Sequence, residues 1–147
     1  MNLAKFSFRL QTYLNLKAKI EDMKRNEFGK AVAALEREKM KLAELEQEKK
    51  DCIEDFRQKV ESIIDTVDLN RYNLFIEMLK GHIKKQTATV AQAEAIVRAK
   101  RAELVEAMKD RKILETLKDK EYTQYLSEEK QNEQKMLDDL VSYRYSR

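Results

Sequence analysis

The chain has 147 residues, of which 39% are charged, with two glycines, no proline and a mean hydropathy of −0.74. This composition excludes a sheet or a globule of many elements, which need turn-forming residues, and leaves a few long helices around a thin core. The 30 basic and 27 acidic residues nearly cancel, to a net charge of +3. A nucleic-acid binder has a large, one-sided basic excess, so we expect no nucleic-acid partner.

Cysteine usage and hydropathy give an expectation for the compartment. Cys52 is the single cysteine, so no internal disulfide is possible, and its place in the apolar repeat predicts a small core residue. No apolar run approaches the ~20 residues of a membrane span, and the first residues lack the apolar core of a signal peptide. We therefore expect a cytoplasmic protein.

The first stretch predicts a helix that begins within the first few residues. Its apolar residues recur at spacings of three and four: Phe6, Leu10, Tyr13, Leu16, Ile20 and Met23. The next strong apolar residue, Phe28, comes one residue late, and Asn26 and Gly29 flank it. Because both are poor helix formers, we expect a local unwinding or slight bend there, without a chain reversal.

A heptad repeat follows, and it predicts the seam of a coiled coil. One row contains Phe28, Leu35, Leu42, Lys49, Phe56 and Ile63, with Ala31, Leu45, Cys52 and Val60 near the second seam position. Lys49 is the one charge in the row. A single charged seam residue commonly sets the register of two helices, and we interpret Lys49 in that way.

The segment 65–71 is the one expected chain reversal. It contains Asp65, Thr66, Asp68 and Asn70, whose side chains bond the backbone locally and cap helices. Asp65 or Asp68 is the predicted N-cap of a second helix.

The strongest periodic stretch comes after the reversal. Its apolar residues fall one heptad apart, with Leu79 and Ala93 on the companion position: Ile76, Ile83, Val90, Val97 and Leu104. A helix with such a stripe needs a partner, and the first arm supplies a matching one. Beyond Leu104 the row turns polar, with Arg111 and Lys118 in heptad positions.

These patterns predict an all-α fold, a long two-helix antiparallel coiled-coil hairpin, as a single domain over residues 1–147. Helix 1 is expected at about 3–64, the turn at about 65–69 and helix 2 at about 70–140. This register places Leu35 opposite Val97 and Phe56 opposite Leu79. Residues 132–147 then overhang the first helix, either as a docking surface or as a frayed end.

The sequence contains no constellation that would support catalysis, a metal site or a cofactor site. Gly81 has none of the neighbours of a phosphate-binding loop, and His82 is the only histidine. The basic residues between Arg98 and Lys120 alternate with acidic ones, which is typical of a solvated face or of a surface for an acidic partner. We therefore expect a protein that is not an enzyme.

The sequence resembles the flagellar export protein FliJ family along most of its length. Five short motifs carry the resemblance: Phe6-x-Phe8-x-Leu10-Gln11-x-x-Leu14, Tyr72-x-x-Phe75-Ile76-x-x-Leu79-x-x-x-Ile83, Arg101-x-x-Leu104-x-x-Ala107, Arg111-Lys112-x-Leu114-Glu115-x-Leu117-Lys118 and Glu133-x-Lys135-x-x-Asp138. It departs at Asp65 to Asn70, where some relatives have a longer turn with a glycine.

The resemblance implies a soluble, stalk-like component of the flagellar type III protein export apparatus. Such a protein inserts into the hexameric export ATPase and promotes its assembly. It also contacts the cytoplasmic domain of the transmembrane export-gate protein and binds export chaperones. It would lie in the cytoplasm, associated with the inner membrane at the flagellar base through its partners only. The alternatives are the equivalent stalk protein of a virulence injectisome and a generic coiled-coil scaffold or holdase.

Two candidate partner surfaces follow from the matched motifs. The resemblance implies a gate contact at the segment after the turn, with Phe75 on the flank of the seam, and its candidate residues are Tyr72, Phe75, Leu79 and Gln86. Packing of Phe75 over the edge of the core is the other interpretation. Acidic loops lining the ATPase pore would attract the basic motif, whose candidates are Arg111, Lys112 and Lys118.

Overall fold

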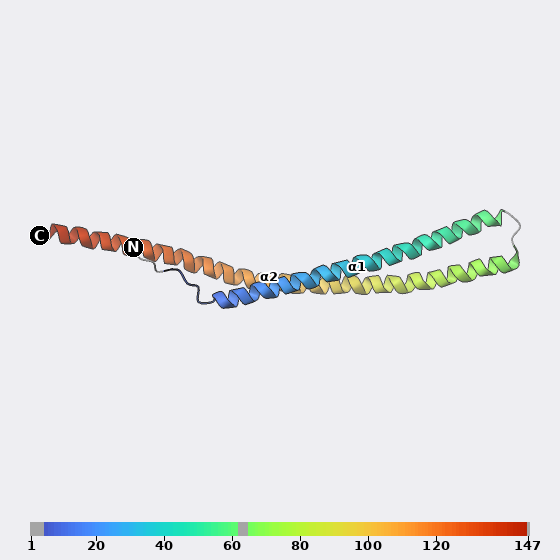
Figure 1. The fold of residues 1–147 in the computed structure, drawn as a ribbon, viewed down its shortest axis with the longest axis horizontal. Helices are drawn as coiled ribbons and strands as arrows, with labels where there is room; N and C mark the ends of the chain where they lie inside the picture. Colours follow the sequence, from blue (N-terminus) through green and yellow to red (C-terminus); the bar gives the residue numbers. More distant parts are fainter. Residues whose placement is uncertain (1–4, 62–64, 147) are drawn as a thin grey trace. The chain divides into compact units, whose positions relative to one another are not determined.

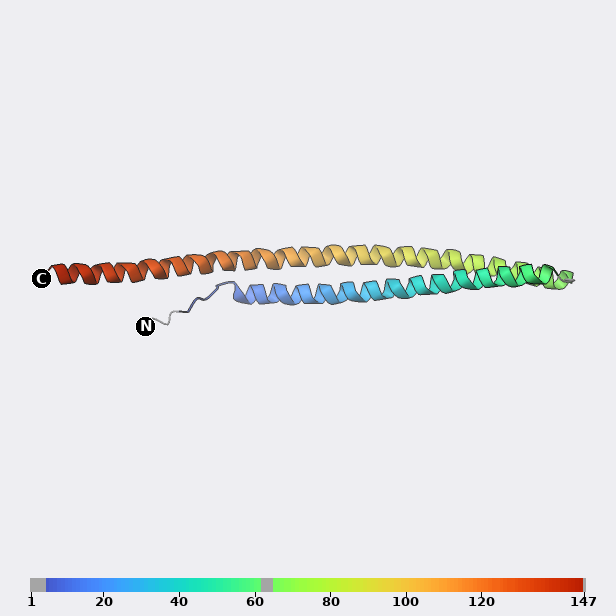
Figure 2. The same ribbon diagram turned by 90° about the horizontal axis from the view of Figure 1, so that it is seen from above.

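The computed structural model describes residues 5–61 and 65–146 and consists of two long helices packed against each other. Helix α1 runs from Gln11 to Val60 and helix α2 from Thr66 to Tyr145. The described residues contain no strand. Figures 1 and 2 show α1 beside α2 with the chain reversed between them, so the predicted fold class, an all-α antiparallel hairpin, is confirmed.

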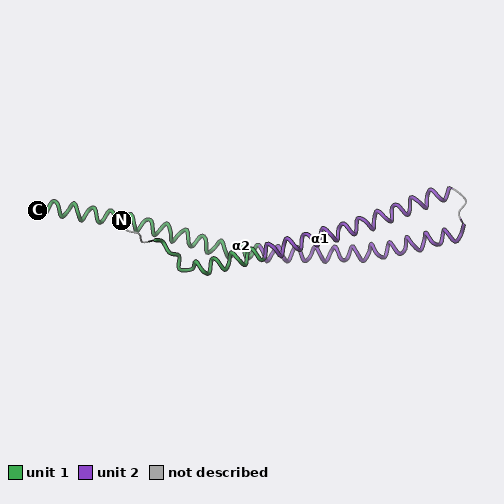
Figure 3. Tube along the Cα trace, viewed as in Figure 1, with its two compact units in different colours: residues 1–23, 105–147 green, residues 24–104 purple. Residues whose placement is uncertain are grey.

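The chain divides into two compact units, and each contains a segment of α1 against a segment of α2 (Figure 3). Unit 2 comprises Lys24–Leu104 and contains the reversal. Unit 1 comprises Met1–Met23 together with Val105–Arg147.

The core of unit 2 is the predicted heptad seam. Leu79 is 1% exposed, Val90 and Leu35 are buried as well, and the other predicted seam residues of α2 are half-buried: Ile76, Ile83, Ala93, Val97 and Leu104. On α1 the half-buried positions continue through Lys49, Cys52 and Phe56. The positions between them are exposed, because a stripe repeating every seven residues keeps only one side of each helix against its partner.

The register of the two helices differs from the prediction. The ring of Phe56 packs against that of Tyr72, at 5.4 Å between centroids, so Phe56 does not face Leu79. Glu38 contacts Gln86 and Glu27 contacts Lys100. These two contacts bracket Leu35, which therefore lies opposite the turn that carries Val90 and not opposite Val97.

The position of the reversal explains this shift. Thr66 already begins α2, so the predicted turn at 65–69 is the first turn of that helix. The carbonyl of Asp65 accepts a hydrogen bond from the N–H of Leu69, at 3.1 Å, as the residue before a helix does. Asp65 is thus the N-cap, and Asp68 lies within the first turn, where its charge favours the positive end of the helix dipole. The predicted seam residue Ile63 lies outside the described residues.

The start of the chain also differs from the prediction. Phe6 and Phe8 precede the helix, which begins at Gln11 and not near residue 3. Phe8, Leu14 and Leu114 form the buried cluster of unit 1, with Phe6 and Leu10 packed against it. The ring of Phe6 also lies 5.2 Å from that of Tyr122 and 5.6 Å from that of Tyr125. The apolar side chains of this segment therefore reach α2 without being helical.

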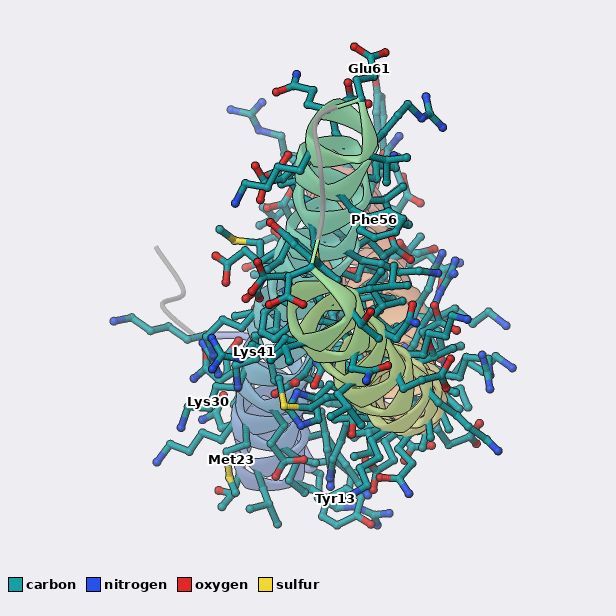
Figure 4. The ribbon with its side chains drawn as sticks, turned by 90° about the vertical axis from the view of Figure 1, so that its right-hand side faces the viewer. Tyr13, Met23, Lys30, Lys41, Phe56 and Glu61 are labelled. Carbon is teal, nitrogen blue, oxygen red and sulfur yellow. The ribbon has the colours of Figure 1, made fainter. Side chains whose placement is uncertain are left out.

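Helix α1 is uninterrupted through Asn26 and Gly29, so the expected unwinding is absent from α1. The seam of the first turns runs through Leu14, Lys17 and Glu21. Half or more of each of the predicted inward residues Tyr13, Leu16 and Met23 is exposed. Tyr13 and Met23 lie at the periphery of the view along the helices (Figure 4). The apolar repeat seemed to slip because Glu21, and not an apolar residue, occupies the heptad position between Leu14 and Phe28.

The end of α2 presents no buried side chain. Every described residue from 131 to 146 is exposed, including Met136, Leu137, Leu140 and Tyr143. None of the helices in the described ranges is both long enough and apolar enough to cross a membrane.

Candidate partner-binding surfaces

Three of the four residues proposed for the gate contact are held in the seam of unit 2. Leu79 is the most deeply buried residue of the described chain, at 1% exposure. The side-chain amide of Gln86 donates to the carbonyl oxygen of Glu38, at 2.9 Å, and to its carboxylate, at 2.6 Å. Together with a contact from Lys41, this amide lowers the pKa of Glu38, because both donors favour the charged carboxylate.

Tyr72 is also engaged within unit 2. Its hydroxyl donates a hydrogen bond to the carboxylate of Asp55, and its ring lies against Phe56. The hydrogen bond lowers the pKa of Asp55, and the ammonium of Lys59 adds to this effect. Tyr72 therefore joins the two helices near the reversal and offers little free surface.

Phe75 is the one predicted gate residue that reaches the surface, with 38% of it exposed. Leu74 and Met78 are 72% and 46% exposed, and both lie within one helical turn of Phe75. We refer to Leu74, Phe75 and Met78 as the turn-end patch. Leu74 and Met78 were not predicted from the sequence. The signal for them is an apolar residue outside the heptad positions, since the apolar stripe of the helix lies elsewhere.

The three residues proposed for the ATPase ring do not form one surface. Arg111 is a seam residue: its Nε donates to the carboxylate of Glu21, and its Nη1 lies 2.6 Å from Glu115. Lys118 is a half-buried seam residue as well, whereas Lys112 is exposed. The heptad repeat explains this separation. Residues 111 and 118 are one repeat apart and share the seam position, whereas residue 112 falls outside the seam.

The seam of unit 1 is ionic at its centre. Glu21 is a charged residue only 5% exposed, and Arg111 is its partner on α2. Lys17 and Asp110 form a second ion pair, at 3.8 Å. The two carboxylates, Glu115 first and then Glu21, raise the pKa of Arg111. Such a buried charge is tolerated only while it is paired, so this ion pair fixes how the two helices of unit 1 meet.

The described residues do not form a metal site. They contain no group of three or more histidine, cysteine or acidic side chains that could hold a metal ion. Cys52 is half-buried, and burial, with Asp55 and Glu48 nearby, raises the pKa of its thiol. A raised pKa keeps the thiol protonated and unreactive, which agrees with the predicted core role of Cys52.

Comparison with protein families gives a match over nearly the whole chain. The family model of the flagellar FliJ protein matches residues 6–147. Searches of curated proteins and of solved structures gave no match. Because the matched residues make up nearly the whole chain, the chain belongs to the FliJ family, a family of non-catalytic proteins of flagellar export.

Proposed function

We propose that this chain is the stalk-like component of the flagellar type III export apparatus. In this role it inserts into the hexameric export ATPase and promotes assembly of the ring. It couples the ATPase to the cytoplasmic domain of the export-gate protein and binds export chaperones. It is held at the inner membrane of the flagellar base through these partners.

The observation that carries the proposal is the match to the family over residues 6–147 of a two-helix antiparallel fold. A central shaft needs a narrow cross-section and contacts at different places along its length. The heptad seam supplies the first, because two helices bury only one stripe each. The turn-end patch of unit 2 and the exposed lysines of unit 1 supply chemically different contacts.

The proposed ATPase contact is tested by adding the purified full-length chain to the purified export ATPase and measuring ATP hydrolysis. We expect stimulation by the wild-type chain and reduced stimulation by Lys112→Glu, since Lys112 is the exposed member of the three candidates. Charge reversal at Arg111 is unsuitable as a test, because it would place two carboxylates against each other in the seam. No stimulation by the wild-type chain would refute the shaft role.

The turn-end patch is the proposed contact for the export gate. An exposed aromatic residue in a small apolar patch can contribute about 2 kcal/mol to binding. Phe75→Ala should therefore weaken binding to the cytoplasmic domain of the gate protein at least about tenfold. Because 38% of Phe75 is exposed, the thermal midpoint should fall only slightly, and ATPase stimulation should stay unchanged.

A control variant separates this contact from general loss of apolar surface. Ile96 is 52% exposed on the same helix, away from the reversal, so Ile96→Ala should bind the gate domain as the wild type does. Binding is measured by isothermal titration calorimetry and folding by circular dichroism. Equal affinities for Phe75→Ala and wild type would show that the gate contact lies elsewhere.

A further inference from the structure

The outer face of α2 in unit 1 carries two adjoining shallow hollows. The first is lined by Lys109, Lys112, Ile113, Thr116, Leu117 and Lys120. The second shares Lys109 and Lys112 and extends the surface to Val105 and Met108, with Arg111 and Glu115 at its edge. We refer to the surface from Val105 to Lys120 as the outer stripe. At 1.5 Å per residue it is ~22 Å long, the length of about four helical turns.

The outer stripe faces away from the seam and leaves apolar side chains uncovered. Ala107 and Leu114, which face α1, are each 6% exposed. Ile113, adjacent to Leu114 in sequence, is 66% exposed, and Leu117 is 37% exposed. Val105 and Met108, at the start of the stripe, are 41% and 38% exposed and lie outside the row of Ile113 and Leu117. Ile113 and Leu117 are four residues apart, and two aliphatic groups one helical turn apart are a surface that a second helix recognises.

The charges along the outer stripe are one-sided. The described residues include no carboxylate in ion-pair contact with Lys109, Lys112 or Lys120. Two of the neighbouring acids are engaged toward the seam: Asp110 pairs with Lys17, and Glu115 pairs with Arg111. Three ammonium groups therefore surround Ile113 and Leu117 without an ion-pair partner among the described residues.

We propose that the outer stripe binds an acidic amphipathic α-helix of a partner protein. The aliphatic row of the partner would cover Ile113 and Leu117, and its flanking glutamates or aspartates would lie against Lys109, Lys112 and Lys120. The charge pattern gives this choice its chemical basis, since opposite charges beside an apolar row set both the partner and its orientation.

Two other occupants fit the surface less well. A second copy of this chain would bring lysines against lysines if the same stripe were used twice. An anionic membrane surface attracts a broad face of cations, but Glu106, Glu115 and Asp119 border the stripe as exposed residues and would be repelled. A helix is narrow enough to contact the stripe without these acids.

Binding of an acidic helix at the outer stripe goes beyond the proposed function. The proposed function names partner proteins, whereas the outer stripe specifies the chemistry of a partner's binding segment. It shares Lys112 with the proposed ATPase contact, so its test uses Lys109 and Lys120 instead. Loss of peptide binding with intact ATPase stimulation, or the reverse, would distinguish the two proposals.

The probe is a synthetic, fluorescently labelled helical peptide of about 18 residues. Leucines at spacings of three and four form one face, and glutamates flank it. Fluorescence anisotropy with the full-length chain should show saturable binding that weakens with added salt, because exposed charges are screened. Lys109→Glu/Lys120→Glu should weaken binding at least about tenfold, and Ile113→Ser/Leu117→Ser should do the same.

A matched control and a charge swap make the test specific. Lys30 and Lys84 are exposed lysines of unit 2, so Lys30→Glu/Lys84→Glu makes the same change in net charge away from the stripe and should bind the peptide normally. A peptide with lysines in place of the glutamates should fail to bind the wild type and should bind Lys109→Glu/Lys120→Glu. Circular dichroism checks that each variant keeps its helices.

Three results would overturn the proposal. The glutamate peptide could fail to bind the wild-type chain, or the control variant could lose as much affinity as Lys109→Glu/Lys120→Glu. The third is binding of phosphatidylserine vesicles, lost in that same variant, without peptide binding. This last result would assign the outer stripe to a lipid surface.

Discussion

Arg111→Ala is expected to lower the free energy of unfolding, because it breaks an ion pair that joins α1 to α2 in the seam of unit 1. The substitution removes the ion pair that Arg111 makes with Glu21, a carboxylate that is 5% exposed in the seam of unit 1. Solvent moderates the loss, because a quarter of the Arg111 side chain is exposed. The measurement is denaturant unfolding followed by circular dichroism.

Two further variants identify the cause. Arg101 is exposed and off the seam, so Arg101→Ala should change the unfolding free energy by less than about 0.5 kcal/mol. Glu21→Leu/Arg111→Leu should be as stable as the wild type or more stable, since well-packed apolar residues commonly equal a buried ion pair. If the double variant were as unstable as Arg111→Ala, loss of side-chain packing and not loss of the ion pair would be responsible.

Leu79→Ala is expected to cost about 3 kcal/mol, within the range for removal of a buried leucine side chain. Leu79 has 1% exposure, and its side chain fills the space between α1 and α2 in unit 2. Leu74 lies five residues earlier on the same helix and is 72% exposed. Leu74→Ala removes the same atoms from a solvated position and should cost less than about 0.5 kcal/mol.

The stability of Leu79→Ala also shows whether a loss of gate binding comes from unfolding or from a lost contact. If Leu79→Ala weakens gate binding, the weakening should follow the fraction of unfolded chain, whereas Phe75→Ala should weaken binding in a folded chain. Equal stability of Leu79→Ala and Leu74→Ala would contradict the burial of Leu79. Thermal unfolding, measured beside the binding experiment, makes the comparison.

The sequence was sufficient for the fold class and for the seam between Ile76 and Leu104. These residues are aliphatic at nearly every heptad position, so periodicity alone identifies the buried side of the helix. It was insufficient in the first turns of α1. There Lys17 and Glu21 occupy the seam while Tyr13 and Leu16 are exposed, so the apolar pattern indicates the wrong face.

For the candidate surfaces, too, the sequence was sufficient for some residues and insufficient for others. The sequence placed Phe75 on the flank of the seam, and 38% of it is exposed. It also proposed Tyr72, Leu79 and Gln86 for the same contact, and these residues join the two helices instead. A motif names residues that lie near one another in sequence, but only burial separates those that hold the fold from those that face outward.

The sequence by itself determined that two long helices pair through a heptad stripe, because the repeat of apolar residues is a property of one helix. Tertiary structure decided the register, the start of α1 and the ionic centre of unit 1. Those features depend on which side chains meet across the two helices, as Phe56 meets Tyr72 and Glu21 meets Arg111. A charged residue is read as solvent-exposed until its partner is known, and pairing is what allows Glu21 to be buried.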